Sequence, residues 1–305
     1  MAARYWRQPG YRYQGVSIHD ARVADFWRNY PLSGWAHVQV DDVQLAMLTA
    51  NDDGVALVYH AFGPDAYEAA SVAAWVSIAR VCSQVADVGA FTGLFAMLAK
   101  RAAPQAQVLA VEPNSASRAR LHTNLTWNGM HNLVQVMPQA VAKTIGVMAL
   151  HVPMGADLLD TGASLLDHGQ STRTELVTTA PIDALLEQAA LGAPDLMKID
   201  VEGFEEAALL GAPRALANGA TLVLEIQAAA LFLKCRTILE SFGYRLFVID
   251  DDNLDLAPAP MGDGVDLWFQ DYVRGRALNY LCVTREAHLQ LARRGVDRVR
   301  GLLPA

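Results

Sequence analysis

Glycines and acidic residues stand at the ends of short apolar runs, where open α/β sheets build ligand sites. The first case is VADVGAFTG at residues 85–93, in which a buried strand leads through a turn into a helix. Gly89 permits a tight turn, and Gly93 lets the helix begin close to the sheet. Phe91 occupies the place of the second glycine of a dinucleotide fingerprint, which argues against close approach of a pyrophosphate. An ordinary strand–helix turn is the alternative explanation of this motif alone.

Acid and amide groups follow the next two predicted strands. In VLAVEPN (108–114), Glu112 ends the second strand, from which one carboxylate can accept hydrogen bonds from both hydroxyls of a ribose. A solvated surface glutamate is the alternative. In MPQAVA (137–142), Gln139 and Ala140 follow the third strand and are a weaker signal for a purine edge. Together these motifs favour a nucleoside site at the carboxyl ends of neighbouring strands.

Ionisable residues alternate along DLMKIDVEGFE at residues 195–205. A period of two puts Lys198, Asp200 and Glu202 on one face of a strand. Charges inside a sheet are costly unless they are paired or used. A structural pair between Lys198 and an acid is therefore one prediction, and a functional role for Asp200 at the strand end is another. Glu225 ends the following strand in TLVLEIQ and either adds a second carboxylate to the same crevice or is a solvated or capping acid.

Composition excludes several classes of protein. The 305 residues are 52% hydrophobic and 18% charged, which is unlike a disordered chain. The net charge of −8 lacks the basic footprint of a nucleic-acid binder. We expect no membrane span and no thiolate zinc site, because no apolar stretch is long enough and the three cysteines form no CxxC pair. The eight histidines form no ligand cluster, so we predict no metal site, and the cysteine pattern suits the cytoplasm.

Strand and helix patterns alternate from residue 66 onward. Right-handed crossovers then give a doubly wound α/β sheet, mostly parallel, with one late antiparallel strand. We predict strands at 85–88, 108–111, 133–137, 147–152, 174–179, 196–201, 221–226, 244–249 and 278–283. We predict helices at 69–79, 93–102, 116–128, 205–217 and 232–242.

The segments around this alternation have a different texture. Residues 18–30 have helical spacing, and apolar runs at 37–48 and 55–62 flank the turn NDDG (51–54) like a β-hairpin. We therefore divide the chain into an N-terminal cap or dimerisation extension (1–65), a catalytic domain (66–290) and a C-terminal tail (291–305). The polar insert 155–174 is predicted to be a substrate lid with Ser164 facing inward, or else an ordinary surface loop.

The motifs together resemble the FkbM family of S-adenosylmethionine-dependent methyltransferases. DVGAFTG, VEPNSASRARLHTNLTWNG, TTAPIDALL and MKIDVEGFEEAALLGA follow that family's pattern in order and spacing over about residues 66–230. Tyr67-Glu68 matches a Tyr-Glu pair that precedes the first motif in the family, whereas Phe91 replaces its usual asparagine. The resemblance implies a Rossmann-like class I methyltransferase domain and an O-methyltransferase that acts on a natural product or saccharide.

The resemblance also implies roles for individual residues. The segment with Asp87, Gly89 and Gly93 would hold the amino-acid end of the cofactor, Glu112 its ribose, and Asp200 would border the methyl group. The full set expected to contact S-adenosylmethionine is Glu68, Asp87, Gly89, Ala90, Phe91, Thr92, Gly93, Glu112, Pro113, Asn114, Gln139, Ala140 and Asp200.

Methylation of an alcohol needs a base, because the hydroxyl loses its proton during attack. Asp200, Glu202 and Glu225 are the candidates. A carboxylate-bound Mg²⁺ is an alternative that we do not favour, since no third oxygen ligand is evident. A nicotinamide-dependent oxidoreductase, a non-catalytic nucleoside-binding protein and an N-methyltransferase remain competing interpretations. The expected partner is a small-molecule acceptor, without nucleic acid or membrane, and the apolar 36–62 region is compatible with a homodimer.

Overall fold

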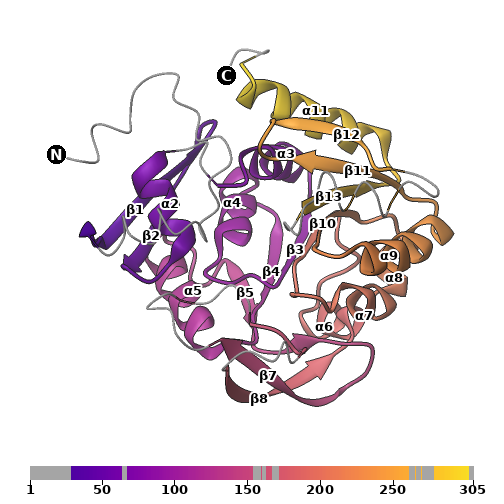
Figure 1. Cartoon of the computed structure of the whole chain (residues 1–305), viewed down its shortest axis with the longest axis horizontal. Coiled ribbons are helices and arrows are strands. Elements are labelled where there is room, and N and C mark those ends of the chain that lie inside the picture. The colour runs from indigo at the N-terminus through magenta and orange to yellow at the C-terminus, as the bar shows by residue number, and fades with distance from the viewer. Residues whose placement is uncertain are drawn as a thin grey trace.

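The computed structural model describes residues 29–63, 67–153, 159, 163–166, 172–260, 265, 269 and 278–301. An eight-stranded sheet forms its centre, with helices on both faces (Figure 1). The strand order is β12-β11-β13-β10-β9-β3-β4-β5. The bounds are β3 Gln84–Val88, β4 Gln107–Val111, β5 Val134–Met137, β9 Leu196–Ile199, β10 Thr221–Ile226, β11 Arg245–Asp250, β12 Asp255–Pro258 and β13 Leu278–Val283.

Strand directions confirm the predicted mostly parallel sheet. The strands β5, β4, β3, β9 and β10 pair in parallel, and β13 runs antiparallel to both β10 and β11. One further strand was missed, because β12 pairs antiparallel with β11 inside a stretch that the sequence indicated as a long loop. The fold is thus a doubly wound, Rossmann-like α/β sheet with two reversed strands rather than one.

Side chains of successive strand residues pack into the two hydrophobic cores on opposite faces of the sheet. Val85 belongs to the core beneath α3 Ala69–Ala79, α4 Leu94–Ala102, α5 Ser115–Trp127 and α11 Glu286–Val299. Its neighbours Ala86 and Val88 belong to the opposite core, beneath α6 Ile182–Gln188, α7 Glu205–Leu210, α8 Pro213–Ala217 and α9 Ala229–Ser241. The predicted helix 205–217 is broken into α7 and α8, since Pro213 cannot continue the hydrogen-bonding pattern of a helix that precedes it. The strands are therefore covered on both sides, as their continuous apolar sequences indicate.

The N-terminal hairpin differs from the prediction. β1 Ser33–Val40 pairs with β2 Val43–Ala50 through a turn at Asp41-Asp42, and Asp41 adopts φ +51°. The second predicted strand, 55–62, is the helix α2 Gly54–Phe62. The side chain of Asp53 caps this helix by accepting a hydrogen bond from the Ala56 N–H at 3.0 Å, so the NDDG segment starts a helix instead of closing a hairpin. The predicted helix 18–30 lies outside the described residues except at 29 and 30.

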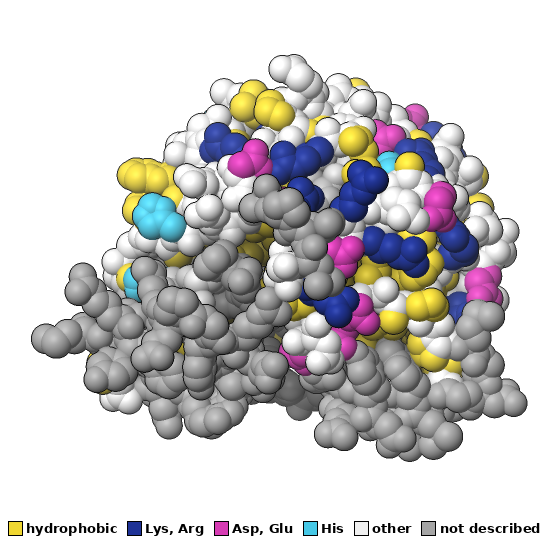
Figure 2. Space-filling model, turned by 90° about the horizontal axis from the view of Figure 1, so that it is seen from above, with side chains coloured by type: hydrophobic (Ala, Val, Ile, Leu, Met, Phe, Trp, Pro, Cys, Tyr) yellow, Lys and Arg dark blue, Asp and Glu magenta, His cyan; other side chains and the backbone are white. Residues whose placement is uncertain are grey.

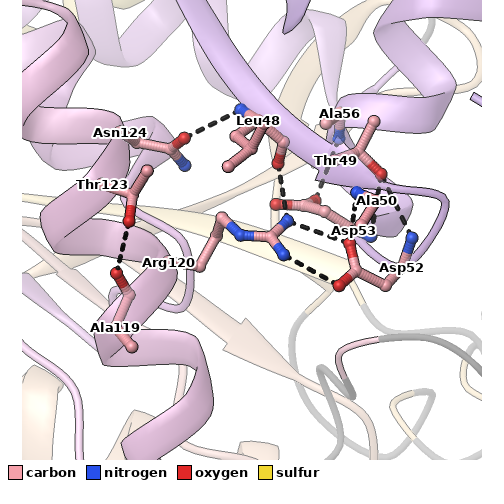
Figure 3. A network of polar contacts seen from close by, with 10 residues as sticks. All are labelled: Leu48, Thr49, Ala50, Asp52, Asp53, Ala56, Ala119, Arg120, Thr123 and Asn124. Carbon is pink, nitrogen blue, oxygen red and sulfur yellow. Dashed lines mark hydrogen bonds and ion pairs between the residues drawn. The ribbon is translucent and has the colours of Figure 1, made fainter. Parts of the chain in front are cut away.

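The hairpin is attached to α5 by a polar network (Figure 3). Arg120 makes two hydrogen bonds to the carboxylate of Asp52, at 2.9 and 2.8 Å, and a third to the Leu48 carbonyl at 2.8 Å. Asn124 accepts the Leu48 N–H at 2.8 Å and donates to the carbonyl of Thr92 at 2.9 Å. The same asparagine therefore contacts both the hairpin and the loop that follows β3.

A small second sheet lies at one end of the molecule (Figure 1). Its order is β6-β8-β7, with β6 Ala140–Val141, β7 Gly146–Pro153 and β8 Thr172–Ala180. Most of the insert 155–174 lies outside the described residues, and its role as a lid stays a prediction. Ser164 is described and is 1% exposed, and its hydroxyl donates to the carbonyl of Glu202 at 2.7 Å.

The C-terminal segment is helical through Val299, although we predicted a tail from residue 291. The helix α11 lies against α3, and Gly295 is where they approach, since a Cβ there would lie 2.5 Å from the Ala73 carbonyl oxygen. The face seen from above carries basic and acidic side chains interspersed rather than gathered by sign (Figure 2). Exposed ion pairs of the described residues include Arg245–Glu286 and Arg300–Asp255.

Candidate active site

The polar motifs meet where the sheet changes its direction of growth. The chain proceeds from β3 to β4 and β5 on one side, and from β9 to β10 on the other, while β3 and β9 are neighbours. The loops that follow β3 and β9 therefore lead away from each other, toward opposite edges of the sheet. In doubly wound sheets, a ligand crevice lies between two such loops. One half of the crevice carries the Gly89 loop, Glu112 and Gln139, and the other carries Asp200 and Glu225.

Gly89 holds the two central strands close together. It has φ +84°, and a Cβ at this position would lie 1.7 Å from the backbone oxygen of Asp200. The Asp200 N–H donates to the Val88 carbonyl at 3.0 Å, and the Gly89 N–H donates to the Val111 carbonyl at 2.9 Å. A glycine is required here by both conformation and space.

Glu112 joins the two loops of the first half. Its carboxylate accepts the N–H of Phe91 and the N–H of Asn114, one at each oxygen and both at 2.7 Å. The side chain is buried, and burial raises the pKa of Glu112 to about 8, against the opposing effect of these two N–H groups. The expectation of a carboxylate free for a ribose is thus modified, since each oxygen already has one partner and keeps one lone pair for a hydroxyl.

Two buried acceptor atoms in this half have no partner among the described residues. Asp87 accepts the Ala96 N–H at 2.8 Å through one oxygen, and its other oxygen has no hydrogen bond. Burial raises the pKa of Asp87 to about 6, although the nearby Lys198 ammonium lowers it. The side-chain oxygen of Gln139 is also buried without a partner. Such atoms are stabilised when a ligand supplies donors.

Lys198 and Asp200 form the predicted structural pair. The Lys198 ammonium lies 2.5 Å from a carboxylate oxygen of Asp200 and 4.7 Å from the centre of the Phe95 ring. Burial favours the neutral amine, but the carboxylates of Asp200 and Glu68 outweigh it and raise the pKa of Lys198. The ammonium is therefore permanently charged, and it orients Asp200 at the end of β9.

Glu202 and Glu225 lie around the same strand ends with different partners. Glu202 accepts a hydrogen bond from the Gln227 side chain at 2.8 Å. Burial and then the charge of Asp200 raise the pKa of Glu202 to about 8. Glu225 is half-buried and has no hydrogen bond among the described residues. Burial and then Asp200 hold the pKa of Glu225 well above its usual range.

Three further polar residues, which the strand-end analysis missed, join this half. Asn279 at the start of β13 donates to Glu68 at 2.9 Å. Asp251, just after β11, accepts the Ser71 N–H at 2.8 Å and the Ser71 hydroxyl at 2.6 Å. Asn279 is 4% exposed, in a strand that is buried throughout. An asparagine within an otherwise apolar strand could have indicated a site residue from the sequence alone, although its partner Glu68 is distant in sequence.

Three non-glycine residues at this site have a left-handed backbone conformation. Glu68, Phe91 and Glu202 adopt φ of +43°, +49° and +51°, a region that residues with a Cβ rarely occupy. Glu68 begins α3, Phe91 lies in the Gly89 loop, and Glu202 follows β9. Strained non-glycine residues persist where surrounding contacts hold them and are frequent in active sites.

Other residues expected at the cofactor have structural contacts. Asn114 caps α5 by accepting the N–H groups of Ala116 and Ser117. The Ala90 N–H donates to Val111, and the carbonyl of Pro113 accepts from Arg118. Gly93 faces Leu121, Thr92 is buried with its carbonyl bonded to Asn124, and Ala140 lies within β6. These contacts shape the loops around the crevice, and direct contact with a cofactor stays a prediction.

Within the described ranges, no group of three or more His, Cys, Asp or Glu residues has the arrangement of a metal site. None of the helices in those ranges combines the length and hydropathy needed to cross a bilayer.

Comparison with solved structures gives distant matches. A methyltransferase FkbM from Methylobacillus flagellatus KT is 17% identical with a TM-score of 0.42, over 65% of this chain and 43% of that one. A precorrin-6y C5,15-methyltransferase from Geobacter metallireducens GS-15 is 13% identical with a TM-score of 0.40, over 70% and 87%. An O-methyltransferase from Bacillus cereus in complex with SAH is 10% identical with a TM-score of 0.39, over 72% and 80%.

Comparison of sequences is more decisive. No curated protein matches the chain. The Methyltransferase FkbM domain family matches residues 87–246, which is somewhat more than half of the chain. This range begins at Asp87, before the Gly89 turn, and ends in β11, so it contains the Gly89 loop, Glu112, Gln139, Asp200 and Glu225. The chain therefore belongs to the FkbM methyltransferase family.

Proposed function

We propose that this protein transfers a methyl group from S-adenosylmethionine to a hydroxyl group of a small molecule. The observation that carries the proposal is the split between β3 and β9, where a glycine loop and a strand-end acid face a second group of carboxylates. Three of the methyltransferases similar in fold are O-methyltransferases by name, one of them in complex with SAH. Family membership supports the transfer itself, and the strand-end acids support the hydroxyl as acceptor.

The first half of the crevice suits the cofactor. Its buried acceptors without partners, Asp87 and Gln139, match the ammonium, hydroxyl and amino donors of an adenosyl amino acid. Glu112 keeps lone pairs for the ribose hydroxyls, and Gly89 keeps the floor of the crevice free of side-chain atoms. We therefore assign the cofactor to the side of β3, β4 and β5, and the acceptor to the side of β9, β10 and β13.

The bound cofactor would supply an activated methyl group on a positively charged sulfur. The chain must then hold the acceptor in line and remove its proton. Holding two reactants in the reacting geometry contributes about 7–11 kcal/mol. Asp200, fixed by Lys198, would border the transferred methyl and stabilise the positive charge.

Glu202 is the base that we favour among the three candidates. A base is most effective when its pKa lies near the working pH, and the pKa of Glu202 is raised to about 8. Asp200 is less suited, because one of its oxygens is bonded to Lys198. Glu225 lies one strand further from the cofactor half.

Cofactor choice is tested by ligand-dependent stability. We expect S-adenosylhomocysteine at 100 times its Kd to stabilise the protein by about 2.7 kcal/mol, and NAD to have no effect. Stabilisation by NAD alone would indicate the oxidoreductase interpretation instead. Binding of S-adenosylhomocysteine without transfer to any compound would indicate a non-catalytic nucleoside-binding protein.

Acceptor chemistry is tested with labelled S-adenosylmethionine and a panel of sugars, phenols and amines. Methylation of hydroxyl compounds is expected, and methylation of amines alone would refute the hydroxyl part of the proposal. With any hydroxyl acceptor found, Glu202→Gln should lower kcat by about 10²- to 10⁴-fold and abolish the rise of kcat with pH. Glu206→Gln is the matched control, because this neighbouring carboxylate pairs with Lys234 on the surface.

A further inference from the structure

The half of the crevice beside β9, β10 and β13, which we assign to the methyl acceptor, contains a compact group of side chains that can accept hydrogen bonds. They come from three elements. Glu68 begins α3, Glu225 ends β10 and Asn279 begins β13. Glu225 and Asn279 are direct partners in the β10–β13 ladder, so their side chains lie on the same face. The Asn279 amide donates to Glu68 at 2.9 Å, which brings all three groups together.

Acceptor atoms of these groups have no hydrogen-bond partner in the part of the chain that the structure describes. Asn279 is 4% exposed, and its side-chain oxygen has no partner among the described residues. Glu225 is half-buried and has no hydrogen bond in the same part of the chain. Of the described donors, those that reach Glu68 are neutral, namely the Asn279 amide and the Tyr67 hydroxyl. An amide oxygen and two carboxylates thus lie close together, and within the described ranges none of them has a cationic hydrogen-bond donor.

The described charged groups around this point are mostly acidic. The groups that interact with Glu68 and Glu225 include the acids Asp87, Asp200, Glu202 and Asp251. Against them stands one described ammonium, that of Lys198, which is bonded to Asp200 and covered by the Phe95 ring. Burial raises the pKa of both Glu68 and Glu225, although the Lys198 ammonium has the opposite effect.

We propose that Glu68, Glu225 and Asn279 form a binding site for a primary ammonium group. Such a group has one positive charge and three N–H donors, which match two carboxylates and one amide oxygen. A single hydroxyl supplies only one donor, a quaternary ammonium supplies none, and an anion would be repelled. This inference rests on the proposed function, because it assigns the ammonium to a ligand of the same crevice.

Two ligands of a methyltransferase carry this chemistry. One is an amine on the acceptor, next to the hydroxyl that is methylated. The other is the α-ammonium of the cofactor's own amino-acid end. The position of the site beside β10 and β13, away from β4 and β5, favours the acceptor, and the experiment separates the two sources.

The test uses calorimetry on the full chain with Glu225→Gln and Asn279→Leu, which keep side-chain size. Binding of S-adenosylhomocysteine is compared with binding of methylthioadenosine, which lacks the amino-acid end. Glucosamine is compared with glucose on protein saturated with S-adenosylhomocysteine. Glu206→Gln again serves as the control, and unfolding curves verify that each variant is folded.

An acceptor site predicts that wild type binds glucosamine more tightly than glucose and that Glu225→Gln weakens glucosamine roughly tenfold to a hundredfold. Both S-adenosylhomocysteine and methylthioadenosine would then bind as in wild type. A cofactor site predicts the same loss for S-adenosylhomocysteine and none for methylthioadenosine. If Glu225→Gln changes neither the affinity difference between glucosamine and glucose nor that between S-adenosylhomocysteine and methylthioadenosine, the ammonium site is refuted. This holds even if Asn279→Leu fails to fold. Failure of wild type to bind S-adenosylhomocysteine refutes the proposed function instead, and the glucosamine comparison, then made without that ligand, still decides the ammonium site.

Discussion

Replacement of Gly89 by alanine tests whether the crevice is built on a close approach of two strands. The new Cβ would lie 1.7 Å from the Asp200 backbone oxygen, about half of an ordinary contact, and 2.8 Å from the carbonyl carbon. Backbone cannot rotate away as a side chain can, so β3 and β9 must separate. Overpacking of this kind costs about 1–3 kcal/mol, and a left-handed conformation at a residue with a Cβ costs about 1–2 kcal/mol. We expect Gly89→Ala to lose about 2–5 kcal/mol of unfolding free energy.

Gly129 provides the matched control. It has φ +70°, and a Cβ there meets no atom within 4 Å, so Gly129→Ala incurs only the conformational cost. Gly93→Ala should fall between the two, because its Cβ would meet the flexible end of Leu121 at 2.2 Å. Urea unfolding followed by circular dichroism measures all three, and calorimetry with S-adenosylhomocysteine measures the crevice. Equal destabilisation by Gly89→Ala and Gly129→Ala would refute the close approach, as would unchanged affinity in Gly89→Ala.

Three further predictions concern stability. Asp52→Asn should destabilise the protein by about 1.5–3 kcal/mol, because the ion pair of Asp52 with Arg120 is largely shielded from solvent. Asp42→Asn removes an exposed ion pair with Arg80 and should cost at most about 1 kcal/mol, and urea unfolding compares the two variants. Burial raises the pKa of Glu112 to about 8 in the folded state, from a value near 4.5 in the unfolded state. Between these values the folded state binds the extra proton, so this group makes the free energy of unfolding fall as pH rises from 4.5 to 8. Between pH 5.5 and 8, the free energy of unfolding of Glu112→Gln should therefore fall less than that of wild type. Trp127→Ala removes a ring stacked at 4.2 Å on Trp35 and should cost about 0.5–1.5 kcal/mol beyond the lost area, and an unchanged near-ultraviolet dichroism signal would contradict the stacking.

The repeating part of the fold was predictable from sequence because its local signals agree. Apolar runs of strand length, each followed by a helical pattern, fixed β3, β4, β9 and β10 to within about two residues, and the helix 69–79 matched α3. The strand-end position of Glu112 and Asp200 followed from the same reasoning. These features depend on neighbouring residues alone, which is why periodicity captures them.

The errors arose where local signals are ambiguous. The run VALVYHAF is apolar throughout, so its length suits either a strand or a helix, and the capping hydrogen bond of Asp53 decides for α2. Residues 291–299 looked like a tail, yet Ala292 and Val296 are buried against the rest of the fold. The contact of Asn279 with Glu68 joins residues 211 positions apart, and only the placement of β13 beside β10 reveals it.

The double contact of Asn124 has a consequence for how this protein can change over time. The Asn124 amide accepts a hydrogen bond from the Leu48 N–H of the hairpin and donates one to the carbonyl of Thr92 beside the crevice. Mutations that shift β2 are therefore transmitted to the loop after β3, although they lie far from it in the chain. Exchange of the hairpin for that of a relative should succeed only when the asparagine, or a residue that bonds in the same way, is inherited with it.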